Sequence, residues 1–205
     1  MIVLSLSVLV TGGARSGKST FAEQICARLS KKNVIYIATG IAFDEEMKER
    51  IKKHRSQRPS DWYTLEAYAQ LEVRLNDLFE RKEHNDGTIF DCALLDCLTI
   101  MTNNFMMDLI EDWDNISDEQ AINIEMKIKS EIKSLYDFCK KHDIHLVIVT
   151  NEVGMGIVPE YKSARYYRDI AGRVNQYAAL MADEVYLCVS GIPVKIKNKL
   201  EKNYI

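Results

Sequence analysis

The most constraining feature of this sequence is a glycine-rich segment near its start, which lies between a short apolar run and a stretch of helical periodicity. Residues 12–19 read GGARSGKS and satisfy the pattern G-x-x-x-x-G-K-S/T. The pattern has meaning only where a buried strand precedes it and a helix follows it, and residues 8–11 and 18–30 meet both conditions. The segment therefore predicts an α/β domain in which a strand, a tight loop and a helix follow one another.

The residue types of this segment suit the binding of phosphate groups. Glycines let the backbone curl so that successive N–H groups point inward at phosphate oxygens, and the following helix adds its positive end. Lys18 can reach the β- and γ-phosphates, and the Ser19 hydroxyl can ligate Mg²⁺. The alternative is a glycine-rich turn that matches by chance. The full motif in its strand–loop–helix context favours a P-loop that binds ATP or GTP.

The remaining sequence alternates between short apolar runs and longer stretches with helical periodicity. This alternation predicts a three-layer α/β fold with a mostly parallel sheet covered on both faces, in a single domain that spans residues 1–205. An acidic, polar segment at 108–119 is expected to be a surface loop between two helices. The predicted strands are 8–11, 34–38, 93–96, 146–150 and 184–189, with 194–197 as a candidate edge strand, and the predicted helices are 18–30, 44–56, 67–82, 117–142 and 162–181.

Composition argues against several other classes of protein. The formal net charge of −3 does not suggest a general nucleic-acid binder. The five cysteines contain no C-x-x-C pair, which argues against a disulfide framework or a zinc site and favours reduced thiols in a cytoplasmic protein. The apolar N-terminus lacks the charged start and the cleavage site of a signal peptide, and no apolar run is long enough to span a bilayer.

Asp96, at the end of the apolar run 93–96, is a candidate magnesium ligand. P-loop proteins usually hold Mg²⁺ with a carboxylate at the end of a neighbouring strand, so Ser19 and Asp96 are the predicted metal ligands. The alternative is that Asp96 caps a helix that begins near Leu98. The P-loop context favours the magnesium role.

His54 lies in the basic stretch KKHRSQRP at residues 52–59. Cationic neighbours disfavour the charged imidazole, and a neutral imidazole is a nucleophile that can attack the α-phosphate of a nucleotide. The nearby arginines can hold phosphates. On local sequence alone, however, a histidine on a basic helix is more often a solvated surface residue.

Residues 149–156, VTNEVGMG, follow another predicted strand. Ligands of open α/β sheets bind beyond the carboxyl ends of the strands, so Glu152 is expected at the rim of the site. It either contacts substrate or acts near the transferring phosphoryl group, or else it is a surface acid in a tight turn. On the next helix, Arg168 is a weaker candidate for phosphate or substrate binding, whereas Arg165 is expected to pair with Asp169 at i+4.

Several segments together resemble the adenosylcobinamide kinase/adenosylcobinamide-phosphate guanylyltransferase family. The H-R-x-x-R-P and N-E-V-G-M-G segments are far more specific than the P-loop, and the resemblance keeps its order over nearly the whole chain. The segments are GGARSGKS at 12–19, YIAT at 36–39, DEEM at 44–47, HRSQRP at 54–59, DCLT at 96–99, NEVGMGIVPE at 151–160 and RDIAGRVNQ at 168–176.

The resemblance implies a bifunctional enzyme of cobalamin biosynthesis with a RecA-like P-loop fold. Such an enzyme phosphorylates the aminopropanol hydroxyl of adenosylcobinamide with ATP or GTP. It then transfers GMP from GTP to that phosphate, which releases pyrophosphate and gives adenosylcobinamide-GDP. The resemblance further implies that GMP passes through a covalent phosphoramidate on His54, that Mg²⁺ is required, and that the protein is a homotrimer without nucleic-acid partners or membrane insertion.

The resemblance also places the site residues. His54 and Lys18 would be catalytic, and Ser19 and Asp96 would hold the metal ion. Two other functions stay open, namely a monofunctional P-loop small-molecule kinase and a non-catalytic GTP-binding switch module. The nucleotide contacts would fall on Gly12, Gly13, Ala14, Arg15, Ser16, Gly17, Lys18, Ser19, Thr39, Gly40, Ile41, Arg55, Ser56, Gln57, Arg58, Glu66 and Asp96.

Overall fold

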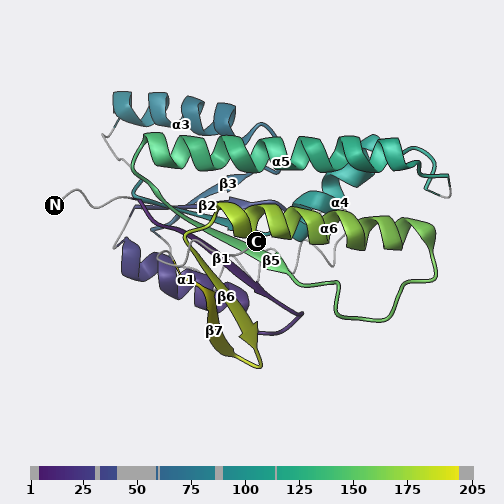
Figure 1. Cartoon of the computed structure of the whole chain (residues 1–205). Coiled ribbons are helices and arrows are strands. Elements are labelled where there is room, and N and C mark those ends of the chain that lie inside the picture. Colours follow the sequence, from purple (N-terminus) through teal and green to yellow (C-terminus); the bar gives the residue numbers. More distant parts are fainter. Residues whose placement is uncertain are drawn as a thin grey trace.

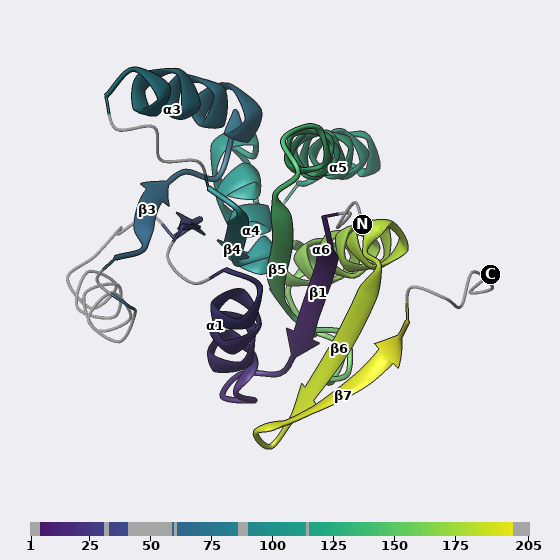
Figure 2. The ribbon, with the colours of Figure 1, turned by 90° about the vertical axis from the view of Figure 1, so that its left-hand side faces the viewer.

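In the computed structural model of the chain, residues 5–30, 33–40, 59, 61–85, 90–113 and 115–198 are described. Their strands form one seven-stranded sheet: β1 (Ser7–Gly12), β2 (Val34–Ala38), β3 (Tyr63–Glu66), β4 (Cys92–Asp96), β5 (His145–Asn151), β6 (Glu184–Val189) and β7 (Ile192–Lys197). The spatial order is β3-β2-β4-β5-β1-β6-β7 (Figure 2). All neighbouring strands are parallel except β6 and β7. The predicted α/β fold with a mostly parallel sheet is confirmed.

Helices cover both faces of the sheet, which gives the three predicted layers (Figure 1). One face carries α1, which packs on β1, β4 and β5. The other face carries α4, α5 and α6, and α5 also contacts α3. The helices are α1 (Lys18–Leu29), α3 (Leu71–Asn85), α4 (Leu98–Leu109), α5 (Asp118–Lys141) and α6 (Lys162–Met181).

The core is divided between the two faces by the alternation of side chains along each strand. Val8 and Val10 of β1 pack in the cluster that contains Cys26 of α1. Leu9, which lies between them, packs in a larger cluster with Ile170 of α6 and other residues of α3 to α6. Because side chains alternate with a period of two, a strand buried on both faces must be apolar at successive positions. This explains the continuous apolar runs from which the strands were predicted.

Most element boundaries agree with the predictions to within two or three residues. The strand β3 was not predicted, and the helix expected from residue 67 begins only at Leu71. The acidic connection is shorter than expected, because α4 extends to Leu109 and α5 begins at Asp118. Ser117 fixes the start of α5 through a capping box with Gln120. The helix predicted at 44–56 lies outside the described residues.

None of the helices in the described part of the chain combines the length and the apolar character that a bilayer span requires.

Candidate phosphate-binding site

The segment GGARSGKS forms the loop between β1 and α1, as predicted. β1 ends at Gly12 and α1 begins at Lys18. Inside the loop the Ser16 N–H donates to the Gly13 carbonyl at 3.3 Å. The Lys18 side chain folds back over the loop, and its Nζ donates to the same carbonyl at 3.1 Å. The lysine ammonium and the helix N-terminus therefore converge on one turn of backbone, which is the arrangement that a phosphate chain requires.

Two glycines of the loop are needed for close approach to β6 and to the turn that follows it. A Cβ on Gly12 would lie 2.6 Å from the Cys188 carbonyl oxygen, a distance that forces the backbone to shift. Gly17 has a φ of +85°, and a Cβ there would lie 3.1 Å from Cα of Gly191. Gly191 also donates its N–H to the Ser16 carbonyl at 3.0 Å. The turn between β6 and β7 thus supports the P-loop, a contact that no pattern in the sequence indicated.

The Lys18 ammonium lies near two buried thiols, Cys97 and Cys188. Burial raises the pKa of Cys97 to about 11, the negative charge of Asp96 adds to this rise, and the positive charge of Lys18 opposes it. Burial also raises the pKa of Cys188, and Lys18 again opposes the rise. Cys97 directly follows β4, and Cys188 lies near the end of β6. In the sheet β4 is the neighbour of β5 and β6 is the neighbour of β1, so the Lys18 ammonium lies between the carboxyl ends of these two strands.

Asp96 is the last residue of β4 and is partly buried. Its Oδ2 accepts a hydrogen bond of 2.9 Å from the hydroxyl of Tyr36 on β2. The N-cap of α4 is Cys97, and no side-chain hydrogen bond caps that helix, so the capping alternative for Asp96 does not hold. The strand that ends in Asp96 was expected to be a neighbour of the strand before the P-loop. This was wrong, because β5 lies between β1 and β4. Pairing across a sheet is set by long-range packing, which the local pattern does not encode.

Ser19 and Asp96 suit Mg²⁺ better than a metal ion whose ligands all come from the protein. Mg²⁺ usually takes one or two carboxylates together with water and substrate phosphates. Ser19 lies in the first turn of α1, and Asp96 shares the α1 face with Leu94 of its own strand. Within the described ranges there is no group of three or more His, Cys, Asp or Glu side chains that could hold a metal ion by itself. The assignment of Ser19 and Asp96 as ligands fits this set and stays a prediction.

Tyr36→Phe is expected to raise the Mg²⁺ concentration that gives half-maximal activity by roughly 10- to 100-fold, the usual effect of losing a residue that orients a metal ligand. The physical reason is that the tyrosine hydroxyl fixes one oxygen of Asp96. The measurement is a Mg²⁺ titration of nucleotide consumption at saturating nucleotide.

Tyr186→Phe is the matched control for this variant. It also removes a hydroxyl that donates to a carboxylate, in this case Glu184 at the amino end of β6. Its Mg²⁺ requirement should equal that of the unmodified protein. An unchanged requirement in Tyr36→Phe, with lower thermal stability, would mean that the hydroxyl serves packing alone.

Thr39 and Glu66 lie at the same carboxyl edge as Asp96. The Thr39 hydroxyl is already engaged, because it accepts from the Cys97 N–H at 2.8 Å and donates to the Cys97 carbonyl at 2.9 Å. Glu66 ends β3 in register with Ala38, which in turn is in register with Asp96. The nucleotide contacts expected of Thr39, Gly40 and Glu66 stay predictions. Ile41, His54, Arg55, Ser56, Gln57 and Arg58 lie outside the described residues.

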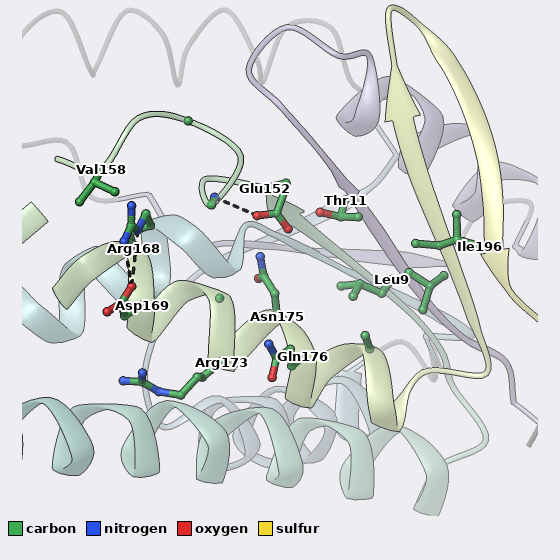
Figure 3. Close-up of a pocket in the computed structure, with 15 residues that line it drawn as sticks. Leu9, Thr11, Glu152, Val158, Arg168, Asp169, Arg173, Asn175, Gln176 and Ile196 are labelled. Carbon is green, nitrogen blue, oxygen red and sulfur yellow. Dashed lines mark hydrogen bonds and ion pairs between the residues drawn. The ribbon is translucent and has the colours of Figure 1, made fainter. Parts of the chain in front are cut away.

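Glu152 lies at the rim of the site, as expected from its place after β5. Its N–H donates to the Gly12 carbonyl at 3.1 Å, which ties it to the first residue of the P-loop. One carboxylate oxygen, Oε1, accepts from the Gly154 N–H at 2.9 Å (Figure 3). Glu152 therefore forms a turn and lies beside the loop, and its contact with substrate or with the transferring phosphoryl group stays a prediction.

The expected pairing of Arg165 with Asp169 was wrong. The Arg165 guanidinium instead donates to the backbone carbonyls of Pro159 and Glu160, and so fixes the segment that enters α6. Asp169 pairs with Arg168 at 3.5 Å. An i, i+4 spacing permits an ion pair on a helix, but here backbone carbonyls of the segment just before α6 bind the same guanidinium.

Most of the chain matches one known protein family. The family described as cobinamide kinase / cobinamide phosphate guanyltransferase matches residues 8–196. The chain belongs to this family. The match includes the P-loop, Asp96 and Glu152, and it also includes His54 and the arginines beside it. The family resemblance of the sequence is therefore confirmed.

Relatives named as bifunctional adenosylcobalamin biosynthesis proteins align with almost the whole chain. The bifunctional adenosylcobalamin biosynthesis protein CobU of Escherichia coli (strain K12) is 46% identical over 94% of this chain and 100% of its own length. CobU of Salmonella typhimurium is 44% identical with the same coverage. The bifunctional adenosylcobalamin biosynthesis protein CobP of Pseudomonas aeruginosa is 35% identical over 93% of this chain and 97% of its own.

Among solved structures, a KaiC-like protein from Pyrococcus horikoshii OT3 is similar, with a TM-score of 0.48 and 11% sequence identity. The similarity covers 89% of this chain and 70% of that one.

Proposed function

We propose that this chain is a bifunctional enzyme of cobalamin biosynthesis. It phosphorylates adenosylcobinamide with ATP or GTP, and it then transfers GMP from GTP to the resulting phosphate to give adenosylcobinamide-GDP. The observation that carries the proposal is a complete P-loop, with Lys18 folded over it and Asp96 at the same sheet edge, in a chain of the cobinamide kinase / cobinamide phosphate guanyltransferase family.

In the kinase reaction the residues of this chain mainly position and neutralise phosphates. Loop amides and Lys18 bind the β- and γ-phosphates, while Ser19 and Asp96 would hold Mg²⁺. The bound ion supplies further charge neutralisation on the phosphate oxygens. The acceptor hydroxyl oxygen forms a bond to the γ-phosphorus, the bond from that phosphorus to the bridging oxygen breaks, and the hydroxyl proton is released.

The transfer reaction uses a covalent step on His54. A neutral imidazole nitrogen bonds to the α-phosphorus of GTP, and the bond to the pyrophosphate oxygen breaks. A phosphate oxygen of the acceptor then bonds to the same phosphorus, the N–P bond breaks, and His54 returns to its free form. This assignment is supported by the resemblance of the segment HRSQRP and by the inclusion of residue 54 in the family match.

Turnover of adenosylcobinamide with GTP, with the phosphate and GDP-linked products followed separately, tests the proposal. Both products are expected, in that order. Formation of the phosphate alone would instead support a monofunctional kinase. Binding of GTP without consumption, in the presence of adenosylcobinamide, would support a switch module.

The same proposal includes a cytoplasmic location and a homotrimer. The cysteines support the first part, since all five are buried and free, as expected in a reducing compartment. The resemblance supports the second part. Sedimentation velocity of the purified protein would contradict it if the mass of a monomer were found.

A further inference from the structure

A pocket of about 770 Å³ lies on the α6 side of the sheet, next to the P-loop (Figure 3). Its walls come from α6, from β1, β6 and β7, and from the turn that follows β5. The volume is in the range of sites for small molecules. It lies across the sheet from α1, because Leu9 lines it, and Leu9 packs with the α3–α6 cluster rather than with α1.

One end of the pocket is joined to the phosphate-binding loop. Thr11, which lines the pocket, directly precedes Gly12. Glu152, which also lines it, donates its N–H to the Gly12 carbonyl. The Glu152 carboxylate is held by the Gly154 N–H through Oε1. A ligand in the pocket therefore reaches the P-loop without crossing the sheet.

The Thr11 hydroxyl has no hydrogen-bond partner among the residues that the structure describes, although the side chain is only 9% exposed. A buried hydroxyl without a partner destabilises the fold, so such groups in native proteins have a partner from solvent or a ligand. By contrast, the polar Asn175 at the pocket wall is already satisfied, since it accepts from Thr150 at 2.6 Å and donates to the Asn151 carbonyl at 3.0 Å. The Thr11 hydroxyl is thus left to bind a ligand, whereas the Asn175 side chain is already held by two hydrogen bonds.

The side of the pocket that is farthest from β7 differs in character from this polar end. Val158 lines it next to Arg168 and is 63% exposed, whereas Ile196 lines the opposite side, on β7 (Figure 3). The charged residues Arg168, Asp169 and Arg173 line the pocket on α6. Met155 and Ile157, in the same turn as Val158, are 81% and 96% exposed. Exposed apolar side chains close together in one segment beside a pocket indicate contact with a partner or a large ligand. The pocket therefore has polar groups next to the P-loop and an exposed apolar segment, residues 155–158, on its Arg168 side.

We propose that this pocket binds the acceptor, with the hydroxyl-bearing arm between Thr11 and Glu152 and the macrocyclic ring against the exposed apolar segment 155–158. The inference rests on the proposed function, because it takes the acceptor to be a ring with amide-bearing arms, one of which ends in a hydroxyl. Such an arm offers donors to the Glu152 carboxylate and to the Thr11 oxygen, and amide groups to the exposed Gln176 side chain of α6.

Gly172→Leu tests the proposal by filling the pocket. Gly172 lines the pocket on α6, and a Cβ there meets no atom within 4 Å. Leucine is also a better helix former than glycine, so thermal stability should stay the same or rise. The KM for adenosylcobinamide in the kinase reaction is expected to rise at least tenfold, and the Kd for GTP, measured by calorimetry, is expected to stay unchanged.

Two controls accompany this variant. Gly172→Ala adds only a Cβ and should change the acceptor KM much less than leucine does. Asn123→Leu adds the same apolar group on the exposed surface of α5 and should leave the KM unchanged. Equal acceptor KM values for Gly172→Leu and the unmodified protein would overturn the proposal. So would a change in mass by light scattering without a change in KM, which would assign the pocket to an interface between copies.

Thr11→Val separates ligand binding from a structural role. Valine keeps the shape of threonine and removes only the hydroxyl, so the melting temperature is expected to hold or rise while the acceptor KM rises several-fold. A lower melting temperature with an unchanged KM would mean that the hydroxyl serves the fold. The proposed function fails separately, since it is lost if the unmodified protein does not phosphorylate adenosylcobinamide at all.

Discussion

Lys18→Ala is expected to lower both the kinase and the guanylyltransferase activity by on the order of 10²-fold or more, the scale of losing a main electrostatic contact to a transition state. The Lys18 ammonium lies over the Gly13 carbonyl, and its charge acts on thiols at the ends of β4 and β6. Both reactions move negative charge along a triphosphate chain in this loop, so one substitution should impair both. The measurement is kcat/KM for each reaction with GTP.

Lys133→Ala is the matched control. Lys133 forms an ion pair with Asp137 on the exposed surface of α5, and exposed pairs of this kind contribute little. Both activities of that variant should equal those of the unmodified protein. If Lys18→Ala turned over at a near-normal rate while remaining folded by circular dichroism, the phosphate site would have to lie elsewhere.

The strands and the P-loop were predictable because their signals are local. A strand buried on both faces needs apolar residues at successive positions, and a phosphate loop needs glycines and a lysine at fixed spacing. The strand β3 gave no such signal. It has four residues, and Tyr63 and Glu66 at its two ends are exposed, so it shows neither a continuous apolar run nor a clear alternation.

Contacts between distant segments were not predictable in the same way. The hydrogen bond from Tyr36 to Asp96 joins residues 60 positions apart, and the hydrogen bond from Gly191 to Ser16 joins opposite ends of the chain. Each depends on strand order, which results from packing of the whole sheet. The insertion of β5 between β1 and β4 has the same origin. The same insertion places Glu152, which follows β5, beside the P-loop. β5 therefore separates the strand of Asp96 from β1 and also contributes Glu152 to the pocket.

Some residues of the candidate site were likewise indicated by local sequence, and others were not. Local chemistry was sufficient to predict that Lys18 and Ser19 follow a tight loop at the start of a helix, whereas their phosphate and metal roles stay predictions. Local chemistry did not identify His54, since a histidine among cations is usually a solvated residue. Only the ordered set of family motifs distinguishes it, and the match over residues 8–196 supports that set. Thr11 gave no signal in the sequence, because its importance arises from a missing hydrogen bond in the folded chain.

His54→Ala is expected to separate the two activities that Lys18→Ala lowers together. GMP transfer should fall by roughly 10⁴-fold or more, the scale of losing a covalent nucleophile, because no other group then bonds to the α-phosphorus. The kinase reaction attacks the γ-phosphorus with the acceptor hydroxyl and should proceed at a rate of the same order as before. Incubation with GTP labelled in the α-phosphate should leave acid-labile label on the unmodified protein and none on the variant.

His145→Ala is the control for this labelling. The imidazole of His145 accepts from the Leu6 N–H at the amino end of β5, the edge of the sheet opposite to the P-loop. Its loss should leave the label in place. Label that persisted in His54→Ala would place the guanylyl group on another residue. A parallel loss of kinase activity would mean that His54 serves nucleotide binding in general, because a residue used only in the covalent step has no bond to make when the γ-phosphate is transferred.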